Sequence, residues 1–497
     1  MSVVLSQSVF LAEQVRDHEG PAAKRSGVSL YELMERAGLA TYQQAISYFP
    51  KASTFAVLAG VGNNAGDGYV VARLAKQAGK QVTVIAAISD KPLKGDALSA
   101  QQAWLDAGGA ITADASAIEQ ADIIIDGLLG TGIQSKVREP FSTLIKAANE
   151  SQVPIVAIDL PSGIHADTGV VQGVAIKAAL TVTFVGIKQG LVTGQGRAHA
   201  GTLEFNDLGI EDAFLKQTSP TAELINYQSQ ARLPERDNNS HKTSHGKLLC
   251  VGGNAGTAGA IRLTAEAALR SGAGMVKVYT HSSSILPVSI GRPELMVTDT
   301  NLISALEWAT CVAIGPGLGQ DTWSKTTFEA VMQYCFTNNK PLVIDADALN
   351  LMAQHASSFP LANTVITPHP GEAARLLNCR ARDIEENRFH AVKQLARSYT
   401  TTCVLKGAGS LIADNSQTWV CTDGSPALAV GGSGDVLTGI IAALIAQGLT
   451  TQQAACLGVC LHAKAGDIAA ERDGERGMLP SDLFAIVREL VNGSFKL

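Results

Sequence analysis

Continuous apolar runs alternate along the chain with stretches whose apolar residues recur at helical spacing. In the first part of the chain the apolar runs lack polar alternation, which favours strands buried on both faces of a parallel sheet. The expected strands are 54–61, 82–88, 121–126 and 153–159, and the expected helices are 30–48, 69–79, 96–107 and 141–150. This order predicts an N-terminal α/β domain.

A polar break separates this series from a second one. The region around residues 217–244 includes LPERDNNSHKTS and has no regular apolar spacing, as is typical of a connection between domains. We therefore predict domains over residues 1–218 and 219–497. The expected strands of the second domain are 247–251, 275–279, 311–314, 341–344, 363–366, 403–413 and 418–421, and long helices follow them. The second domain is therefore also predicted to be α/β.

The composition agrees with this division and excludes some partners. A chain of 497 residues with 46% hydrophobic residues and 48 glycines suits more than one domain built on buried sheets. Its net charge of −6 gives no electrostatic footprint for nucleic acid or for an anionic membrane. The apolar run 439–449 is too short to cross a bilayer, which takes about 20 residues. We therefore expect neither a nucleic acid nor a membrane as partner.

The cysteines and the first residues bear on the cellular compartment. All eight cysteines follow residue 249, none forms a CxxC pair, and most lie in apolar runs, as expected of core residues. Residues 1–20 have no basic segment ahead of an apolar one, so they do not resemble a signal peptide. A reducing, cytoplasmic location is expected.

Three loops of the first domain each follow an expected strand: GNNAGDG at 62–68, DGLLGTG at 126–132 and DLPSG at 159–163. The carboxyl ends of parallel strands form the ligand crevice of such sheets, so a shared site is expected. The first loop opens a helix whose free N–H groups suit a phosphate, although it is neither the dinucleotide fingerprint nor a P-loop. The alternative is that Asn, Asp and Gly only form tight turns here.

The same loops carry hard oxygen ligands. Asn64, Asp126 and Ser162 would offer an amide, a carboxylate and a hydroxyl oxygen at neighbouring strand ends. Such a set suits an alkali or alkaline-earth cation better than zinc.

The most specific signal in the second domain is GGSGDVLTG at 431–439, followed by a helical run. Consecutive glycines at a helix start expose several backbone N–H groups and form an anion hole. Asp435 at its rim is placed to accept the proton of a substrate hydroxyl that attacks phosphorus. The alternative is that Ser433 or Asp435 only caps the helix.

Three further loops again follow expected strands: GPGLG at 315–319, Asp345-Ala-Asp347 and TPHPGE at 367–372. A fourth, KGAGS at 406–410, is expected to lie between two strands. His369 lies between two prolines and is therefore rigidly placed, which favours contact with the substrate. Asp347 is a candidate to position Mg²⁺, with a plain turn as the alternative.

Taken together, these motifs resemble a known family. GNNAGDG, DGLLGTG and IDLPSG are similar to the YjeF N-terminal domain, which has a Rossmann-like, three-layer fold. GPGLG, DADALN, TPHPGE, KGAGS and GGSGDVLTG are similar to the ribokinase-like YjeF C-terminal domain. Both sets, in this order and over nearly the whole chain, resemble the family of bifunctional NAD(P)H-hydrate repair enzymes.

The resemblance implies a definite chemistry. The substrates would be NADHX and NADPHX, in which water has added across the C5–C6 bond of the nicotinamide ring as R and S epimers at C6. The N-terminal domain would interconvert the epimers with K⁺ bound. The C-terminal domain would dehydrate the S form with Mg²⁺ and ADP, releasing AMP and phosphate. A homo-oligomer is also expected of ribokinase-like domains.

The resemblance also assigns residues of the first domain. It places the hydrate on Asn63, Asn64, Ala65, Gly66, Asp67, Gly130, Thr131, Gly132, Ile133, Gln134, Ser135, Lys136 and Asp159. It places potassium on Asn64, Asp126 and Ser162, and Asp159 is the candidate acid/base. The family usually has glycine where this chain has Ala65, which raises the question of a positive φ there.

In the second domain the resemblance assigns substrate contacts to Ala260, Gly317 or its neighbour Leu318, His369 and Asp435. It assigns nucleotide contacts to Lys406, Gly407, Ala408, Gly409, Ser410 and Gly434. Asp435 is the expected general base. The family often has threonine where this chain has Ser433, and the hydroxyl is kept.

Two alternatives stay open from the sequence. One is an ordinary ribokinase-like kinase of a sugar or pyrimidine alcohol with a regulatory N-terminal domain, which the glycine-rich motif alone does not exclude. The other is an N-terminal domain that only binds a partner, as YjeF-like domains of scaffolding proteins do. Retention of Asn64, Asp126, Asp159 and Ser162 favours a working pocket.

Overall fold

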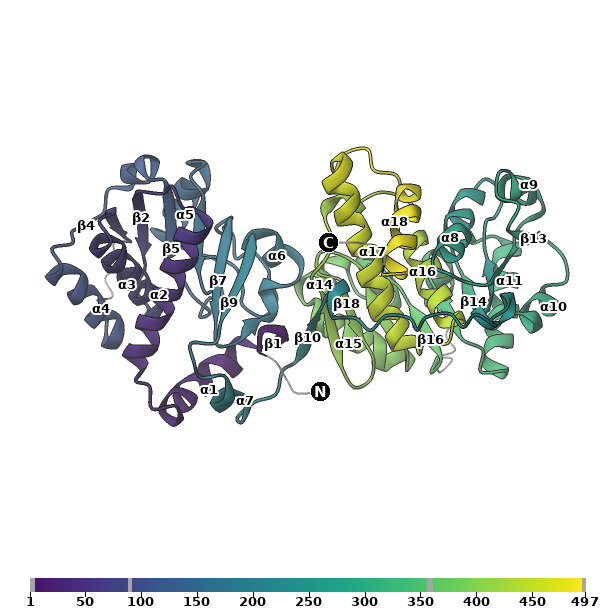
Figure 1. Ribbon diagram of the computed structural model, residues 1–497, viewed down its shortest axis with the longest axis horizontal. Coiled ribbons are helices and arrows are strands. Elements are labelled where there is room, and N and C mark those ends of the chain that lie inside the picture. The colour runs from purple at the N-terminus through teal and green to yellow at the C-terminus, as the bar shows by residue number, and fades with distance from the viewer. Residues whose placement is uncertain (1–4, 88–91, 355–360, 494–497) are drawn as a thin grey trace. The chain divides into compact units, whose positions relative to one another are not determined.

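The chain forms two compact units, Met1–Glu223 (unit 1) and Leu224–Leu497 (unit 2) (Figure 1). The computed structural model describes residues 5–87, 92–354 and 361–493. Each unit has its own apolar core, so each is described by itself.

Unit 1 is built on a seven-stranded parallel sheet with the order β4-β3-β2-β5-β6-β7-β9. Its strands are β2 (Thr54–Ala59), β3 (Gln81–Ala86), β4 (Ile111–Thr112), β5 (Ile123–Gly127), β6 (Ile155–Ile158), β7 (Leu180–Phe184) and β9 (Thr202–Asn206). A short strand, β1 (Ser8–Phe10), pairs in parallel with β8 (Ile187–Lys188) and antiparallel with the start of β10 (Ala222–Ile225). Strand order reverses between β2 and β5, which marks the expected position of a ligand crevice.

Helices cover both faces of this sheet. They are α1 (Ala12–Arg25), α2 (Leu30–Tyr48), α3 (Asn63–Gln77), α4 (Gly95–Asp106), α5 (Phe141–Glu150), α6 (Gly194–Ala200) and α7 (Glu211–Leu215). Alternate residues of β2 enter different cores: Phe55 and Val57 pack with α2 and α3, whereas Ala56 and Leu58 pack with α5. Unit 1 is therefore a three-layer α/β fold.

Unit 2 contains seven parallel strands in the order β13-β12-β11-β14-β15-β16-β17, extended by antiparallel β18 and β19. They are β11 (Lys247–Val251), β12 (Met275–Tyr279), β13 (Met296–Thr298), β14 (Cys311–Ile314), β15 (Leu342–Ile344), β16 (Thr364–Ile366), β17 (Thr402–Leu405), β18 (Leu411–Ala413) and β19 (Thr418–Cys421). Strand order reverses between β11 and β14, so the loops after these strands flank a second crevice position.

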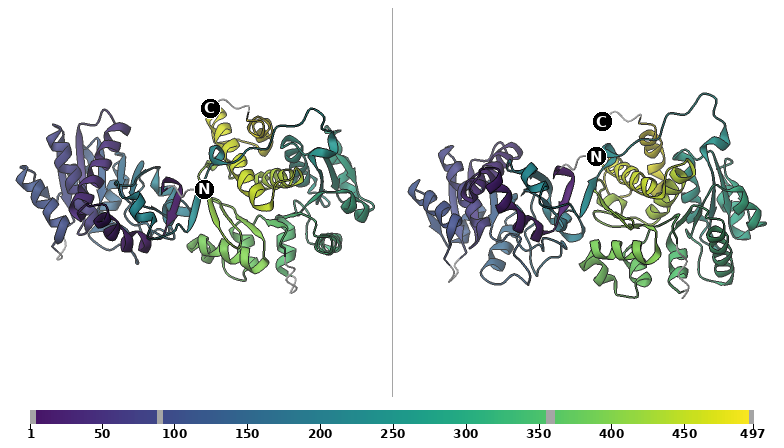
Figure 2. Two further views of the ribbon diagram at one scale, coloured as in Figure 1. Left: turned by 60° about the horizontal axis from the view of Figure 1, so that its bottom comes forward. Right: turned by 90° about the horizontal axis from the view of Figure 1, so that it is seen from below.

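The helices of unit 2 lie on both sides of its sheet, as the turned views show (Figure 2). They are α8 (Ala258–Arg270), α9 (Ile285–Ser289), α10 (Leu302–Trp308), α11 (Thr322–Thr337), α12 (Ala346–Gln354), α13 (Pro370–Leu376), α14 (Ala381–Glu386), α15 (Arg388–Tyr399), α16 (Ser433–Ala446), α17 (Thr451–Asp473) and α18 (Leu483–Val491). The apolar α16 is nearly all buried and packs against α8 and α17. The sheet therefore holds the start of α16 next to its carboxyl edge.

The predicted α/β fold class is confirmed, and two element boundaries are corrected. The helix expected from residue 69 begins at Asn63, because the GNNAGDG loop forms the first turns of α3. The strand expected over 403–413 is two strands, β17 and β18, with the KGAGS loop between them. The last residue of the strand expected over 82–88 lies outside the described residues.

Candidate functional sites

Unit 1 has a cleft of about 790 Å³ at the carboxyl ends of β2, β5 and β6. The predicted substrate residues that line it are Asn63, Asn64, Asp67, Gly130, Thr131, Gly132, Ile133, Gln134, Ser135, Lys136 and Asp159. Ala65 and Gly66 instead face inward from α3. Ala65 is fully buried, and a Cβ added at Gly66 would lie 2.6 Å from the sulfur of Met34. These two positions therefore serve packing.

The alanine at position 65 is compatible with its backbone. It lies in the first turn of α3, with its N–H donating to the carbonyl of Gly62, and it has no positive φ. The family's usual glycine is therefore not needed at this position for conformational reasons.

The three predicted cation ligands come together around the backbone of Leu129. The Ser162 hydroxyl donates to Asp126 Oδ1 at 2.6 Å and lies 3.1 Å from the Leu129 carbonyl oxygen, and the Asn64 amide lies 3.3 Å from the same oxygen. Asp126 is fully buried, and burial raises the pKa of its carboxyl to about 6 although hydrogen bonds from Ser162 oppose the rise. Asp126 is thus mostly ionised at pH 7, next to the Ser162 hydroxyl, while the Asn64 side chain meets the Leu129 carbonyl through its amide nitrogen.

Asp159 directly follows β6 in the left-handed region, with φ of 62°. A non-glycine residue persists there only when its surroundings hold it. Its Oδ1 accepts hydrogen bonds from Lys188 Nζ, from the Thr183 hydroxyl at 3.0 Å and from the Phe184 N–H at 3.3 Å. Lys188 is 1% exposed and also donates to the Phe184 carbonyl at 3.0 Å. The predicted acid/base is therefore fixed through one oxygen.

In unit 2, α16 begins without a side-chain cap. Its N-cap is Gly432 with φ of 93°, a conformation that favours glycine. The Ser433 hydroxyl pairs with His462 Nε2 at 3.1 Å instead of capping, and Asp435 lies two residues further along the first turn. The alternative in which Ser433 or Asp435 only caps this helix is therefore wrong.

Asp435 faces other charged groups across this helix start. Burial raises the pKa of its carboxyl to about 7, Asp345 adds to the rise, and Lys406 opposes it. A carboxyl with a pKa near neutrality is suited to take and return a proton.

The partly exposed Lys406 and the buried Asp345 form an ion pair beside Asp435. Lys406 Nζ lies 2.8 Å from Asp345 Oδ1, and the Thr438 hydroxyl of α16 donates to Asp345 Oδ2 at 2.7 Å. Burial alone would lower the pKa of Lys406, but Asp345 and Glu372 outweigh it and raise that pKa. The ammonium is therefore held charged, and a Cβ on Gly434 would lie only 3.2 Å from it. Predicted nucleotide residues Lys406 and Gly434 are thus adjacent.

A buried arginine holds the start of the KGAGS loop through hydrogen bonds to its backbone. Arg388 is 1% exposed and donates to the carbonyls of Leu405 and Lys406, the latter at 3.1 Å. Gly407 has φ of 138°, and a Cβ there would lie 2.9 Å from the Arg388 guanidinium. Ala408, Gly409 and Ser410 continue this turn, in which the Ser410 hydroxyl donates to the Gly407 carbonyl.

His369 is the N-cap of α13. Its Nδ1 accepts the N–H of Gly371 at 2.9 Å, so its proton is assigned to Nε2, which lies 3.5 Å from Glu372. Burial and the nearby Lys406 lower the pKa of His369. The half-exposed ring is therefore neutral and keeps one donor nitrogen.

The remaining predicted substrate positions differ in access. The Thr264 hydroxyl lies 3.3 Å from the carbonyl of Ala260 and 3.0 Å from that of Asp435, so Ala260 is close to the start of α16. Gly317 is partly exposed, whereas Leu318 is fully buried with its N–H and C=O bonded inside the fold. Of these two, Gly317 is the accessible one.

Two family models match the chain in sequence. The model described as YjeF-related protein N-terminus matches residues 30–190, and the model described as NAD(P)H-hydrate dehydratase matches residues 248–489. The bifunctional NAD(P)H-hydrate repair enzyme Nnr of Escherichia coli is 47% identical, over 99% of this chain and 95% of the relative. The chain belongs to the bifunctional NAD(P)H-hydrate repair enzyme family.

Other relatives in this family align over similar lengths. The Nnr enzyme of Vibrio cholerae is 43% identical over 97% of this chain and 98% of its own length. The bifunctional NAD(P)H-hydrate repair enzyme of Leishmania braziliensis is 38% identical over 99% of this chain and 95% of its own.

Sequence reasoning missed several residues that this family member places in its sites. Lys188 carried a signal, because a lysine inside the apolar run LTVTFVGIKQGL needs a buried partner. Asp345 carries no sequence signal of its own as the ion-pair partner of Lys406, whereas Asp347 accepts the Gly319 N–H at 2.8 Å. Glu19 of α1 lines the cleft of unit 1 without any sequence signal.

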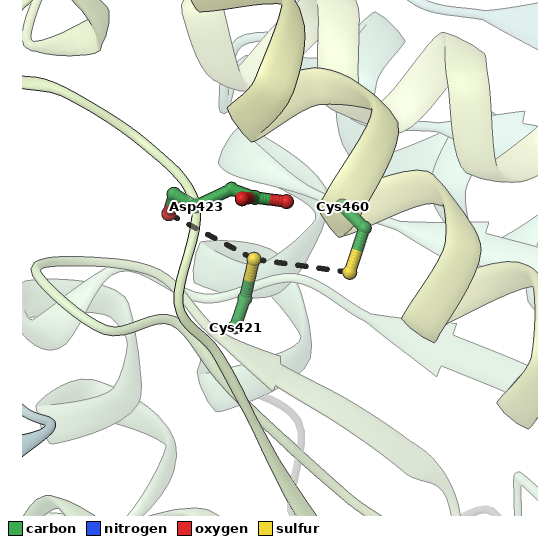
Figure 3. Close-up of side chains that lie close together, drawn as sticks. All are labelled: Cys421, Asp423 and Cys460. Carbon is green, nitrogen blue, oxygen red and sulfur yellow. Dashed lines mark hydrogen bonds between the residues drawn. The ribbon is translucent and has the colours of Figure 1, made fainter. Parts of the chain in front are cut away.

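A cluster of two cysteines and an aspartate lies away from both sites (Figure 3). The sulfurs of Cys421 and Cys460 are 3.8 Å apart, and Asp423 accepts the Tyr227 N–H at 2.7 Å. Hydrogen bonding to Cys421 and burial raise the pKa of Cys460 well above its usual value. Both cysteines are buried, as expected of core residues. No helix among the described residues has the length and apolarity to cross a membrane.

Proposed function

We propose that this chain repairs hydrated nicotinamide cofactors in two steps. Unit 1 interconverts the R and S epimers of NADHX and NADPHX, and unit 2 dehydrates the S epimer to NADH or NADPH with ADP. Family membership supports this pair of activities. The observation that carries the proposal is the ionisable Asp435 beside the Lys406–Asp345 pair at a glycine-rich helix start, on the same chain as the oxygen-lined cleft of unit 1.

The dehydration follows from leaving-group chemistry. Hydroxide leaves poorly at neutral pH, so the C6 hydroxyl attacks the β-phosphorus of ADP and gives a phosphate ester and AMP. The lone pair of the ring nitrogen then expels phosphate. Loss of a proton from C5 restores the C5=C6 double bond of the reduced nicotinamide.

The residues of unit 2 would divide this work. Asp435 takes the proton of the attacking C6 hydroxyl, for which its raised pKa is suited. Lys406 and the free N–H groups at the start of α16 stabilise negative charge on the phosphoryl oxygens. The KGAGS loop and Gly434 contact the AMP part, while Ala260, Gly317 and His369 contact the hydrate.

The donor atoms of unit 1 fit a potassium ion. Asp126, Ser162 and the Leu129 carbonyl offer oxygens, and Asp126 supplies the negative charge. Asn64 would add its Oδ1, while its Nδ2 donates to the Leu129 carbonyl. A bound K⁺ would hold the loop after β5 against the start of α3. The cleft-lining residues Gly130 to Lys136 belong to this loop, so its order bears directly on hydrate binding.

Magnesium would enter unit 2 with the phosphates of ADP, since Mg²⁺ is commonly held by one or two carboxylates plus substrate oxygens. Asp347 is suited to be one of these carboxylates. Among the described residues only its Oδ2 accepts a hydrogen bond, which leaves Oδ1 for the metal ion. Asp345 fits less well, since both of its oxygens are engaged by Lys406 and Thr438.

The direct test is the absorbance of the purified chain with S-NADHX, Mg²⁺ and either ADP or ATP, together with a phosphate assay. The proposal predicts that NADH appears with one phosphate per NADH and faster with ADP. A phosphorylated product that accumulates without NADH would instead indicate an ordinary kinase.

Three further properties are proposed alongside the activity. We expect a cytoplasmic homo-oligomer that binds no nucleic acid. Light scattering coupled to size exclusion would measure the oligomeric state, and a mass equal to that of one chain would contradict the homo-oligomer.

A further inference from the structure

Three carboxyl groups and one ammonium meet at the base of the unit 1 cleft. Glu19, Asp67, Asp159 and Lys188 all line it, and they come from α1, α3, the end of β6 and β8 respectively. The charges of Asp159 and Lys188 influence the pKa values of both Glu19 and Asp67, which places the four groups within short electrostatic range. Three carboxyls with one cation in a half-buried site retain at least one proton near neutral pH.

The two oxygens of Asp159 are in different situations. Oδ1 accepts from Lys188, Thr183 and Phe184, whereas Oδ2 accepts no hydrogen bond within the described part of the chain. Lys188 thereby fixes the orientation of the carboxylate and leaves one oxygen for a ligand or water. Lys188 is buried behind Asp159 and acts as a positioning residue.

Glu19 differs from Asp159 in its hydrogen bonding and its ion pairing. It has no ion pair or hydrogen bond within the described residues, and it borders the same cleft. Burial raises the pKa of its carboxyl to about 7, Lys188 opposes the rise, and Asp159 adds to it. Burial also raises the pKa of Asp67, well above its usual value. Of these two carboxyls, Glu19 has the pKa near neutrality that suits giving up its proton.

We propose that unit 1 epimerises the hydrate by exchanging its C6 hydroxyl with water, with Glu19 and Asp159 as the acid and base. This deepens the proposed epimerase function and rests on it. The C6–O bond breaks as Glu19 gives its proton to the hydroxyl, which leaves as water, and the ring-nitrogen lone pair forms an N1=C6 double bond. A water molecule then adds to the other face of C6 and gives its proton to Asp159.

This step is balanced and needs no further reactant. One water leaves, one water adds, and the proton lost by Glu19 is matched by the proton gained by Asp159. In the reverse direction the two carboxyls exchange roles. The intermediate is a cation, which suits a cluster in which carboxyls outnumber ammonium groups.

The test follows oxygen at C6. Purified R-NADHX is incubated with the full chain and K⁺ in H₂¹⁸O. Nucleotide is left out so that no dehydration takes place. The epimers are then separated, and their ¹⁸O content is measured by mass spectrometry. The proposal predicts one ¹⁸O in each S-NADHX formed, above the level of an enzyme-free sample. S-NADHX that keeps ¹⁶O would overturn it, whereas absence of any epimerisation would instead overturn the proposed function itself.

Variants of α1 test the assignment of Glu19. Glu19→Gln should lower the epimerisation kcat by about 10²- to 10⁴-fold with little change in KM, and Glu19→Asp should recover part of the loss. Glu13→Gln, an exposed glutamate of the same helix, is the matched control and should leave the rate unchanged.

The pH profile separates proton transfer from a structural effect. Wild-type epimerisation should fall above about pH 7 as Glu19 loses its proton in the field of Asp159, Asp67 and Lys188. Glu19→Gln should abolish this fall in rate above about pH 7. A Glu19→Gln enzyme with wild-type kcat would remove Glu19 from the mechanism, and a large loss in Asp67→Asn alone would assign the proton to Asp67.

Discussion

Replacement of Asp435 by asparagine should abolish dehydration and, at the same time, stabilise unit 2. The shape of the side chain is kept, but the C6 hydroxyl loses the group that takes its proton. Loss of a general base costs about 10²- to 10⁴-fold in kcat. At about 1.4 kcal/mol per tenfold this corresponds to about 2.7 to 5.5 kcal/mol of transition-state stabilisation.

The stability effect follows from the pKa of Asp435. The pKa of Asp435 in the folded state is about 7 against an ordinary value of 3.8, with burial as the largest cause and Asp345 second. The folded state therefore binds the proton more tightly than the unfolded state, so stability is lost as the pH rises from the unfolded to the folded pKa. Ionising Asp435 then costs at most about 4 kcal/mol at pH 8. Asparagine removes that cost.

Two assays on the same variant check both effects. NADH absorbance with S-NADHX and ADP gives kcat, and calorimetry at pH 5 and pH 8 gives the Tm of the unit 2 transition. We expect Asp435→Asn to raise Tm at pH 8 and to lose most of this gain at pH 5. Glu329→Gln, an exposed substitution on α11, is the control for both measurements.

Two results would refute the reasoning. An Asp435→Asn enzyme with more than a tenth of the wild-type kcat would show that this carboxylate is not the base. A Tm at pH 8 equal to or below that of the wild type would show that Asp435 is not ionised at a cost in the folded state. ADP binding by calorimetric titration should be unchanged, which separates loss of chemistry from loss of the nucleotide site.

Three further predictions concern other residues. Lys406→Met should destabilise unit 2 by about 3 to 5 kcal/mol in urea unfolding, because it leaves Asp345 buried without its cation; a change below 1 kcal/mol would contradict the pairing. Asp126→Asn should weaken activation of the epimerase by K⁺ about 10- to 100-fold in a KCl titration, and an unchanged titration would contradict the oxygen site. Lys188→Met should lower epimerase kcat much more than it raises KM, since Asp159 loses its orienting cation; equal effects on both would contradict a positioning role.

The sequence predicted the sheets and both site loops because those features are local. Apolar runs such as 247–251 and 311–314 form strands with these bounds, and glycine-rich loops at strand ends lie where parallel topology requires. The start of α3 was predicted too late, because glycines and asparagines favour a loop when judged residue by residue. Tertiary contacts overrule this, since Asn64 and Gly66 are buried in the first turns of α3.

The charged partners in the two sites were beyond local reasoning. Lys188 and Asp159 are separated by β7 and meet only through the fold, as do Lys406 and Asp345. Glu19 lies on a helix with no motif, and its raised pKa arises from burial against groups on other elements. Spacing in the sequence carries no information about such pairs.

The central claim is that one chain both epimerises and dehydrates the hydrate, and purified R-NADHX tests it most directly. R-NADHX is supplied with ADP, Mg²⁺ and K⁺, and NADH and phosphate are followed together. All of the R epimer should become NADH, with one phosphate released per NADH, at a rate well above spontaneous epimerisation. NADH formation limited to the spontaneous rate, with S-NADHX consumed rapidly in a parallel sample, would contradict the claim for unit 1.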